Sequence, residues 1–262
     1  MSNVNGCKIA IPLYLWPGYG RLPCAWETIL TSAQENPIVV VNPNSGPDCK
    51  PHDLFKDAVQ KCQAAGIKVL GYVRTEYSGR SLKIVRKDLQ LYKEWYDVDG
   101  FFIDEMYHWG GLCYVVLKLP ATHKYRNCNY SALCIVDAAQ VEYYSLIKAA
   151  ASKGQAVQPI LVLNPGCSSF PEAYLAQGDI FVTFEESADK YAAYQPAPFM
   201  SKYPKSKFWH MIHSTTSDKA AQVLQQFQQQ HAGWLYLTDL TIDNPYKDLP
   251  ESSIWQLQLQ AA

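Results

Sequence analysis

The sequence has no long apolar run, no excess of either charge and no closely spaced pair of cysteines. A membrane-spanning helix needs roughly 20 apolar residues in succession, so we expect no transmembrane segment. Lysine and arginine number 23 against 24 aspartates and glutamates. This balance excludes a generic nucleic-acid binder, which needs excess cations to displace phosphate counterions. The eight cysteines form no CxxC pair, and the sequence therefore predicts no zinc site.

Several short motifs are missing as well. The start of the chain, residues 1–8, lacks the charged segment and apolar stretch of a signal peptide, which favours a cytoplasmic location with reduced thiols. No GxGxxG turn follows the first apolar run, and neither a P-loop nor a GxSxG motif occurs. These absences speak against a dinucleotide site, a nucleotide-phosphate site and a serine nucleophile. We expect neither a metal nor another cofactor.

Apolar residues make up 48 % of the chain, and many fall in short apolar runs separated by amphipathic stretches. Such runs mark strands that are buried on both faces, as in a parallel sheet covered by helices. We predict strands at Ile9–Leu15, Ile38–Asn42, Lys68–Val73, Phe101–Asp104, Ile160–Asn164, Ile180–Phe184, Phe208–His213 and Trp234–Thr238. The clearest helical patterns are Pro23–Ala33, Asp53–Ala65, Leu82–Trp95, Ala138–Ser152, Asp218–Gln230 and the tail from Ser252.

Strand–helix units repeated eight times in about 250 residues are typical of a (β/α)8 TIM barrel. We therefore predict an α/β fold in which residues 1–262 form one barrel domain, and we expect a monomer. An open doubly wound sheet is the alternative, and the missing glycine-rich turn argues against it. A long insertion after the fourth strand, residues 107–136, shows no periodicity. It has three interpretations: a lid over the barrel mouth, an insertion irrelevant to chemistry, or an artefact of the gene model.

In such a barrel the active site lies at the carboxyl ends of the strands, and here these ends carry polar groups. They are Tyr14, Asn42, Tyr72 with Thr75 and Tyr77 just beyond, Asp104 and Glu105, Asn164, Glu185 and Glu186, His213 and Asp239. Two carboxyl groups at one rim are what glycosidic cleavage needs. One donates a proton to the leaving oxygen, and the other attacks the anomeric carbon or activates a water. Asp104, Glu105 and Glu185 are the catalytic candidates.

Asp104 and Glu105 are adjacent, so they cannot both face the barrel interior while the strand continues. We expect Glu105 to be the more exposed, and one carboxylate of a pair can raise the pKa of the other by like-charge repulsion. The bland interpretation is that carboxylates at strand ends cap the following helices, but it weakens when two strand ends carry them. Aromatic residues near the same ends, such as Tyr14 and Tyr72, offer apolar faces with polar tips that suit a sugar. Ordinary packing explains about half of these aromatic residues equally well.

Several stretches of the chain occur together in one known family. They are Ile11–Tyr14 (IPLY), Asn42–Pro47 (NPNSGP), Gly71–Tyr77 (GYVxTxY) with Arg80, Asp99–Glu105 (DGFFIDE), Leu163–Gly166 (LNPG), Phe184–Glu185, and Thr238–Leu240 (TDL) followed by Asn244–Tyr246 (NPY). These motifs fall in order and cover nearly the whole chain except the insertion. In them the chain resembles the spherulation-specific family 4 (spherulin-4-like) glycoside hydrolases.

The resemblance implies a (β/α)8 enzyme that makes internal cuts in an α-1,4-linked galactosamine-containing polysaccharide of the galactosaminogalactan type. It implies Asp104, Glu105 and Glu185 as catalytic acids. Together with the strand-end pattern it marks the substrate-binding candidates Tyr14, Asn42, Asn44, Tyr72, Thr75, Tyr77, Arg80, Asn164, His213 and Asp239. Family members are usually secreted or held at the cell surface, in contrast to the missing leader. Two departures from the family pattern are Asp48, where glycine is common, and the insertion directly after the acidic pair.

Four carboxylates at one rim, at positions 104, 105, 185 and 186, would attract a cationic, deacetylated galactosamine although the net charge is only −1. The polysaccharide is the only partner that we expect. The alternative to a hydrolase is a catalytically inactive carbohydrate-binding barrel of the same family, in which the insertion or Asp48 misplaces the acids. A lysine-dependent aldolase is a remoter option, because Lys68 lies at the wrong end of its strand.

Overall fold

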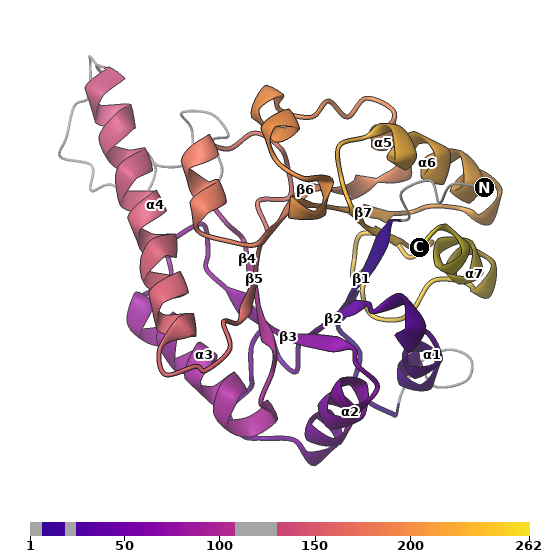
Figure 1. The fold of residues 1–262 in the computed structure, drawn as a ribbon, viewed down its shortest axis with the longest axis horizontal. Helices are drawn as coiled ribbons and strands as arrows, with labels where there is room; N and C mark the ends of the chain where they lie inside the picture. The colour runs from indigo at the N-terminus through magenta and orange to yellow at the C-terminus, as the bar shows by residue number, and fades with distance from the viewer. Residues whose placement is uncertain (1–6, 19–24, 108–129) are drawn as a thin grey trace.

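The computed structural model describes residues 7–18, 25–107 and 130–262, the last range by its backbone alone up to residue 137. Within these ranges the strands are all parallel and close into a barrel in chain order, with β8 pairing with β1 (Figure 1). They are β1 (Lys8–Leu13), β2 (Ile38–Val41), β3 (Lys68–Arg74), β4 (Gly100–Asp104), β5 (Ile160–Leu163), β6 (Ile180–Ser187), β7 (Phe208–His213) and β8 (Trp234–Leu237). The predicted strands and the (β/α)8 class are confirmed.

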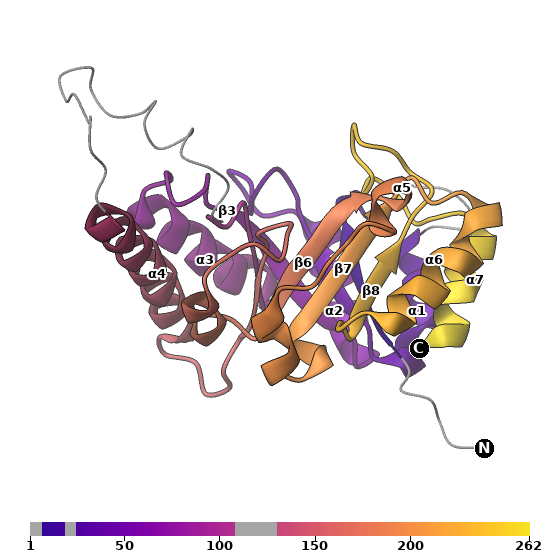
Figure 2. The same ribbon diagram turned by 90° about the horizontal axis from the view of Figure 1, so that it is seen from above.

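Helices surround the barrel on its outer side (Figures 1 and 2). They are α1 (Ala25–Thr31), α2 (Asp53–Ala64), α3 (Leu82–Tyr96), α4 (Tyr130–Ser152), α5 (Ala188–Tyr191), α6 (Ser217–Gln229) and α7 (Ser252–Ala261). Short 3-10 turns complete the connections: η1 (Ala33–Glu35), η2 (Glu172–Ala176), η3 (Pro198–Lys202) and η4 (Lys205–Lys207). In the ranges that the structure describes, no helix is long and apolar enough to cross a membrane.

Most predicted helices end within a few residues of the observed ones, and α4 is the exception. It begins at Tyr130 rather than near Ala138, so helix occupies the last residues of the predicted insertion. That stretch includes Ala132 and Leu133, which have high helix propensity. The rest of the insertion, residues 108–129, lies outside the described residues. The short 3-10 turn η2 replaces a full helix between β5 and β6, which accounts for the close spacing of these two strands in the sequence.

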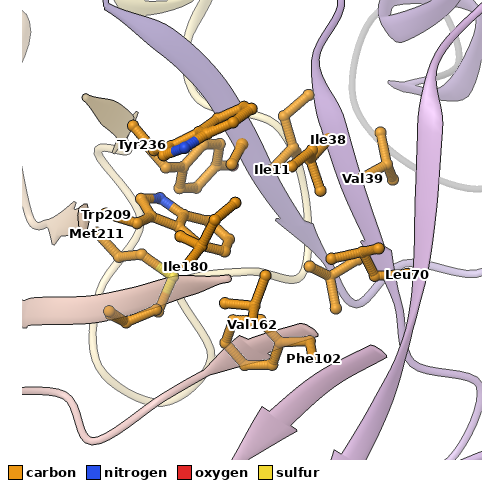
Figure 3. Packing of buried hydrophobic residues seen from close by; sticks show 14 of the residues in the cluster. Ile11, Ile38, Val39, Leu70, Phe102, Val162, Ile180, Trp209, Met211 and Tyr236 are labelled. Carbon is orange, nitrogen blue, oxygen red and sulfur yellow. The ribbon is translucent and has the colours of Figure 1, made fainter. Parts of the chain in front are cut away.

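Aromatic and branched side chains fill the barrel interior (Figure 3). Phe102, Trp209 and Tyr236 are fully buried, and the rings of Phe102 and Trp209 meet edge to face with centroids 5.6 Å apart. Burying a large apolar side chain of this kind contributes about 1.5–3 kcal/mol. The interior is therefore a packed core, and a ligand can reach only the mouth of the barrel.

Gly71 lets helix α3 approach strand β3 closely. Tyr92 of α3 packs on Gly71, where a Cβ would lie 2.6 Å from the Tyr92 ring. The Tyr92 hydroxyl donates a hydrogen bond to the carbonyl oxygen of Val41 at 3.3 Å. Because Tyr72 follows Gly71 directly and strand residues alternate in direction, this contact helps to fix the strand from which Tyr72 faces the barrel.

A bulge at Thr183 sets the direction of the acidic residues in β6. A bulge inserts one extra residue and shifts the register of the strand, so that Glu185 pairs with Met211 and Glu186 with Ile212. Residues paired across parallel strands face the same side, and successive residues face opposite sides. Met211 belongs to the packed cluster of the barrel (Figure 3). Glu185 therefore faces the barrel, and Glu186 faces away from it.

Candidate active site

Two carboxyl groups meet at the mouth of the barrel through one shared side chain. Asp104 ends β4, Glu185 lies near the end of β6, and Asn164 follows β5 between them. The amide nitrogen of Asn164 donates a hydrogen bond of 2.7 Å to Asp104 Oδ1 and another of 2.7 Å to Glu185 Oε2. These two carboxylate oxygens therefore lie no more than twice 2.7 Å apart.

Two tyrosines complete the hydrogen bonding of this pair. The Tyr72 hydroxyl donates to Asp104 Oδ2 at 2.6 Å, and the Tyr246 hydroxyl donates to Glu185 Oε1 at 2.7 Å. The Tyr14 ring lies between them, edge to face, with centroids 5.3 Å from Tyr72 and 5.4 Å from Tyr246. Each of the four carboxylate oxygens thus has a neutral donor, which is how a buried carboxyl group avoids a large desolvation cost.

The pKa of Glu185 is raised to about 7. Burial is the main cause, because it disfavours the charged form, and the negative charge of Asp104 adds to it. Hydrogen bonds from Asn164 and Tyr246 oppose the shift only in part. Glu185 can therefore keep a proton close to neutral pH, as a general acid must.

Burial also raises the pKa of Asp104, but more groups oppose the shift. They are the hydrogen bonds from Tyr72, from the backbone of Glu105 and from Asn164, and the positive charge of Arg74. Two such coupled carboxyl groups share their titration. The extra donors and the cation favour the ionised form of Asp104. When the pair holds one proton, that proton therefore resides on Glu185.

The two neighbouring carboxylates face different surroundings. Glu105 is more exposed than Asp104, as expected; burial and then the charge of Asp104 raise its pKa, and Arg74 opposes this, with Nε 4.0 Å from Glu105 Oε2. The Glu186 carboxylate contacts the Lys190 ammonium group, and hydrogen bonding from Lys190 lowers the pKa of Glu186. Of the four predicted rim carboxylates, only two therefore form the close pair.

A left-handed turn follows β3 beside Glu105. Glu76, Tyr77 and Ser78 have φ angles of 51°, 53° and 69°, a region that costs non-glycine residues roughly 1–2 kcal/mol each. Glu105 secures this turn at two points. Its carbonyl oxygen accepts from the Tyr77 N–H at 2.8 Å, and its carboxylate accepts from the Glu76 N–H at 3.1 Å. The turn leaves the Tyr77 side chain half-exposed near the acidic residues.

Three predicted substrate-binding residues, Tyr14, Tyr72 and Asn164, lie at the carboxyl pair. Others hold the loops around it. Asn42 Oδ1 accepts from the Gly46 N–H at 3.0 Å, and Asn44 donates to Asp48 at 3.0 Å. These contacts stabilise the loop after β2.

Thr75 and Arg80 also have partners within the protein. Thr75 is fully buried, and its hydroxyl bonds to the carbonyl oxygens of Asp104 and Glu105 at 2.8 and 2.9 Å. Arg80 pairs with Asp88 at 2.7 Å. Thr75 therefore supports the backbone of the acidic residues, and Arg80 ties the loop after β3 to α3.

The last two candidates, His213 and Asp239, lie at the end of β7 and just beyond β8. His213 is buried, with Nδ1 2.9 Å from the Ser214 hydroxyl and Nε2 3.5 Å from Glu186 Oε1. Asp239 accepts the N–H of Glu251 at 2.8 Å, at the start of α7. The structure therefore connects them to Glu186 and α7.

Asp48 fits its position in the loop after β2. Its φ of 74° is a conformation that glycine adopts readily, and aspartate is among the few other residues that tolerate it. Its carboxylate bonds to Asn44, to the Cys49 N–H and to His52, at 3.0, 2.7 and 2.7 Å. These hydrogen bonds lower the pKa of Asp48. They tie the loop after β2 to the start of α2.

Sequence reasoning missed three residues of this site. Tyr246 lies in the NPY motif beyond β8, and only the barrel closure brings it to Glu185. Arg74 lies two residues after Tyr72, so strand alternation alone could have found it. The Tyr144 hydroxyl joins Ser78, the Tyr107 N–H and Thr75, at 3.2, 2.8 and 3.1 Å, and no motif marks it.

The chain matches the model described as spherulation-specific family 4 over residues 8–262. The chain belongs to spherulation-specific family 4. The resemblance noted from its motifs is thereby confirmed. Spherulin-4 of Physarum polycephalum is 27 % identical over 245 residues, which are 88 % of this chain and 63 % of that protein. The family member described here thus spans less than two thirds of the length of this curated relative.

Solved structures share the fold of this family member. Sph3 of Aspergillus clavatus, solved in complex with GalNAc, has a TM-score of 0.74 at 22 % identity, with 98 % of both chains covered. A chitinase from Chromobacterium violaceum has a TM-score of 0.54 at 12 % identity, covering 98 % of this chain and 100 % of that chain. At these identities the likeness concerns the barrel fold alone.

Proposed function

We propose that the protein is a glycoside hydrolase that cuts within an α-1,4-linked, galactosamine-containing polysaccharide. The observation that carries this proposal is the Asp104–Glu185 pair, joined by Asn164 at the mouth of a barrel. Membership of the family and the amino sugar bound by Sph3 support the choice of substrate. The tyrosine rings at the pair support a sugar ligand, because each combines an apolar face with a polar tip.

In the proposed reaction Asp104 is the nucleophile and Glu185 the general acid and base. Asp104 attacks the anomeric carbon while Glu185 gives its proton to the leaving oxygen, and the glycosidic C–O bond breaks. Water then attacks the glycosyl ester on Asp104 and returns a proton to Glu185, which releases the sugar. The raised pKa of Glu185 supplies the protonated carboxyl that the first step needs.

The spacing of the pair favours retention of configuration. Retaining enzymes hold their two carboxyl groups about 5–5.5 Å apart, whereas inverting enzymes leave about 6.5–9.5 Å for a water. The oxygens that share Asn164 are separated by no more than twice 2.7 Å. Little room remains between them for an attacking water, so a covalent intermediate is the better fit.

The test is hydrolysis of defined α-1,4-linked galactosaminide oligomers, followed by the new reducing ends and by NMR of the anomeric product. We expect internal cleavage with the α configuration retained. Binding of the oligomers without any turnover by the wild-type protein would instead identify the inactive carbohydrate-binding barrel.

A further inference from the structure

The Asn164 side chain is fixed by hydrogen bonds within the protein. The residue is only 5 % exposed. Its backbone N–H donates to the Ile103 carbonyl at 2.8 Å, and its own carbonyl accepts from the Met106 N–H at 2.8 Å. Its side-chain oxygen accepts from the Gly166 N–H, again at 2.8 Å. Gly166 has a φ of 67°, so glycine suits the turn that brings this N–H back to the amide.

The hydrogen bonds of Asn164 leave little capacity for a sugar hydroxyl. A primary amide has two N–H donors and one oxygen acceptor. Asp104 and Glu185 take both donors, and Gly166 occupies the oxygen. The Gly166 contact also fixes the amide orientation, since a flipped amide would direct its oxygen at two carboxyl groups.

We propose that Asn164 is a positioning residue that holds Asp104 and Glu185 at one separation and supports the ionised form of each, rather than a ligand for the substrate. The expected effect on turnover rests on the proposed function, whereas the expected effect on the two carboxyl groups does not. The inference differs from the sequence expectation, which placed Asn164 among the substrate-binding residues.

The charged and titratable groups around the pair define what Asn164 contributes. Tyr72 and Arg74 of β3 and Glu105, which follows β4, act on Asp104, and Tyr246 acts on Glu185. Tyr14, which follows β1, lies near both carboxyl groups. Among the described residues, Asn164 is the neutral hydrogen-bond donor that the two carboxyl groups share. Hydrogen bonds from Asn164 favour both charged forms, so their removal should raise both pKa values.

The first test is the pH dependence of turnover in Asn164→Ala. Both limbs of the profile should move to higher pH by at least about half a unit, because the nucleophile and the acid both gain protons more readily. We expect kcat to fall about 10- to 100-fold with KM within about threefold of wild type. A raised KM with unchanged kcat and an unmoved profile would overturn the inference in favour of substrate binding.

Gln258→Ala is the matched control. Gln258 is another buried amide, and its oxygen and nitrogen bond to the backbone of Leu237 at 2.7 and 3.0 Å. Its loss should lower the thermal midpoint as Asn164→Ala does, yet leave both limbs of the pH profile in place. Equal movement of the profile in both variants would show that destabilisation alone is responsible, and the inference would fail.

A second measurement does not depend on turnover. Titration of the 13C carboxyl signals of labelled glutamates, with Glu185 assigned from Glu185→Gln, should show a higher pKa for Glu185 in Asn164→Ala than in the wild type or the Gln258 variant. If Asn164→Ala does not fold, the isosteric Asn164→Asp should raise the pKa of Glu185 further, because a donor becomes a third carboxyl group. An unchanged pKa contradicts the inference even if the enzyme is active. A shifted pKa in a protein without turnover supports the inference and rejects only the proposed function.

Discussion

The mouth of the barrel holds two kinds of carboxyl group, an inner pair and an outer pair. Each residue of the inner pair is followed in the chain by a residue of the outer pair. The inner pair, Asp104 and Glu185, is partly buried, and within the described residues its hydrogen bonds come from neutral donors. The outer pair consists of Glu105, which contacts a backbone N–H and lies near Arg74, and Glu186, which contacts Lys190. Burial raises the pKa of Glu185, whereas the cation lowers the pKa of Glu186.

This difference shows that position along the strand matters less than the partner that a carboxyl group receives. Strand alternation sends Glu185 and Glu186 to opposite sides. Among the residues that the structure describes, Lys190 bonds to Glu186, whereas Glu185 has no bonded cation. A carboxyl group that is largely shielded from water and has no bonded cation can hold a proton near neutral pH. A carboxyl group that contacts an ammonium group, as Glu186 does, stays ionised at neutral pH.

The comparison predicts its largest effect for the inner pair. Asp104→Asn and Glu185→Gln should each lower kcat on unactivated oligomers by about a thousandfold or more, since each removes a group that acts on the reacting bond. Steady-state kinetics together with sugar binding measured by calorimetry test this. Glu186→Gln is the matched control and should stay within about threefold of wild type. An equal loss in the Glu186 variant would break the distinction between the pairs.

The next effect concerns stability. The pKa of Glu185 in the folded protein lies above its usual value. Its contribution to folding stability is therefore fully present below about pH 4.5 and is lost as the pH rises through about 7. Glu185→Gln should therefore gain stability relative to wild type between pH 5 and 8, by at most about 3 kcal/mol. Urea unfolding at both pH values measures this. No change in the difference between the two proteins would contradict the burial of an ionising Glu185.

Glu186→Gln should show the opposite trend with a smaller size. Its folded pKa is lowered, so its contribution is present above about pH 4.5 and is lost as pH falls through the folded value. The substitution should cost about 0.5 kcal/mol or less at pH 6, because the pair with Lys190 is partly exposed. The cost should decrease toward pH 3.

Glu105 differs from Glu186 within the outer pair, because burial and the charge of Asp104 raise its pKa. Its substitution therefore sharpens the comparison. We expect Glu105→Gln to lower kcat/KM only about tenfold, because glutamine can still accept the Glu76 N–H that secures the left-handed turn. Glu105→Ala removes that acceptor and should reduce activity further, with a larger rise in KM. If Glu105→Gln lost as much activity as Asp104→Asn, Glu105 would have to be assigned to the reacting pair.

The smallest effect concerns the charge of the substrate. The sequence suggested that four carboxylates attract a free amine, but Lys190 contacts Glu186 and Arg74 lies near Glu105. We therefore expect N-acetylated and deacetylated oligomers to differ in kcat/KM by less than about threefold at physiological salt, where exposed charges are screened. A strong preference for the free amine would restore the electrostatic hypothesis.

Much of the fold was predictable because each strand is a short apolar run between turn signals. The convergence of residues 104 and 185 followed from the rule that strand ends of a parallel barrel share one rim. Strand alternation also correctly predicted that Glu105 differs from Asp104 in exposure. These features depend on local periods that a sequence displays directly.

The remaining features depend on contacts between distant segments. The bulge at Thr183 determines which glutamate of β6 faces inward. No residue type in this strand predicts the bulge. The left-handed turn at Tyr77 contains no glycine and exists because Glu105 and Tyr144 hold it. Likewise, Thr75 and Arg80 looked like ligand contacts at a strand end, yet their partners lie inside the protein.

The most direct test of the account is the search for a glycosyl group on Asp104. In Glu185→Gln, a galactosaminide with an activated leaving group needs no acid for the first step, and the missing base slows hydrolysis of the intermediate. Mass spectrometry of peptides after rapid quenching should show one sugar residue attached to Asp104. A label on Glu105, or a product of inverted configuration with no label, would contradict the Asp104–Glu185 assignment.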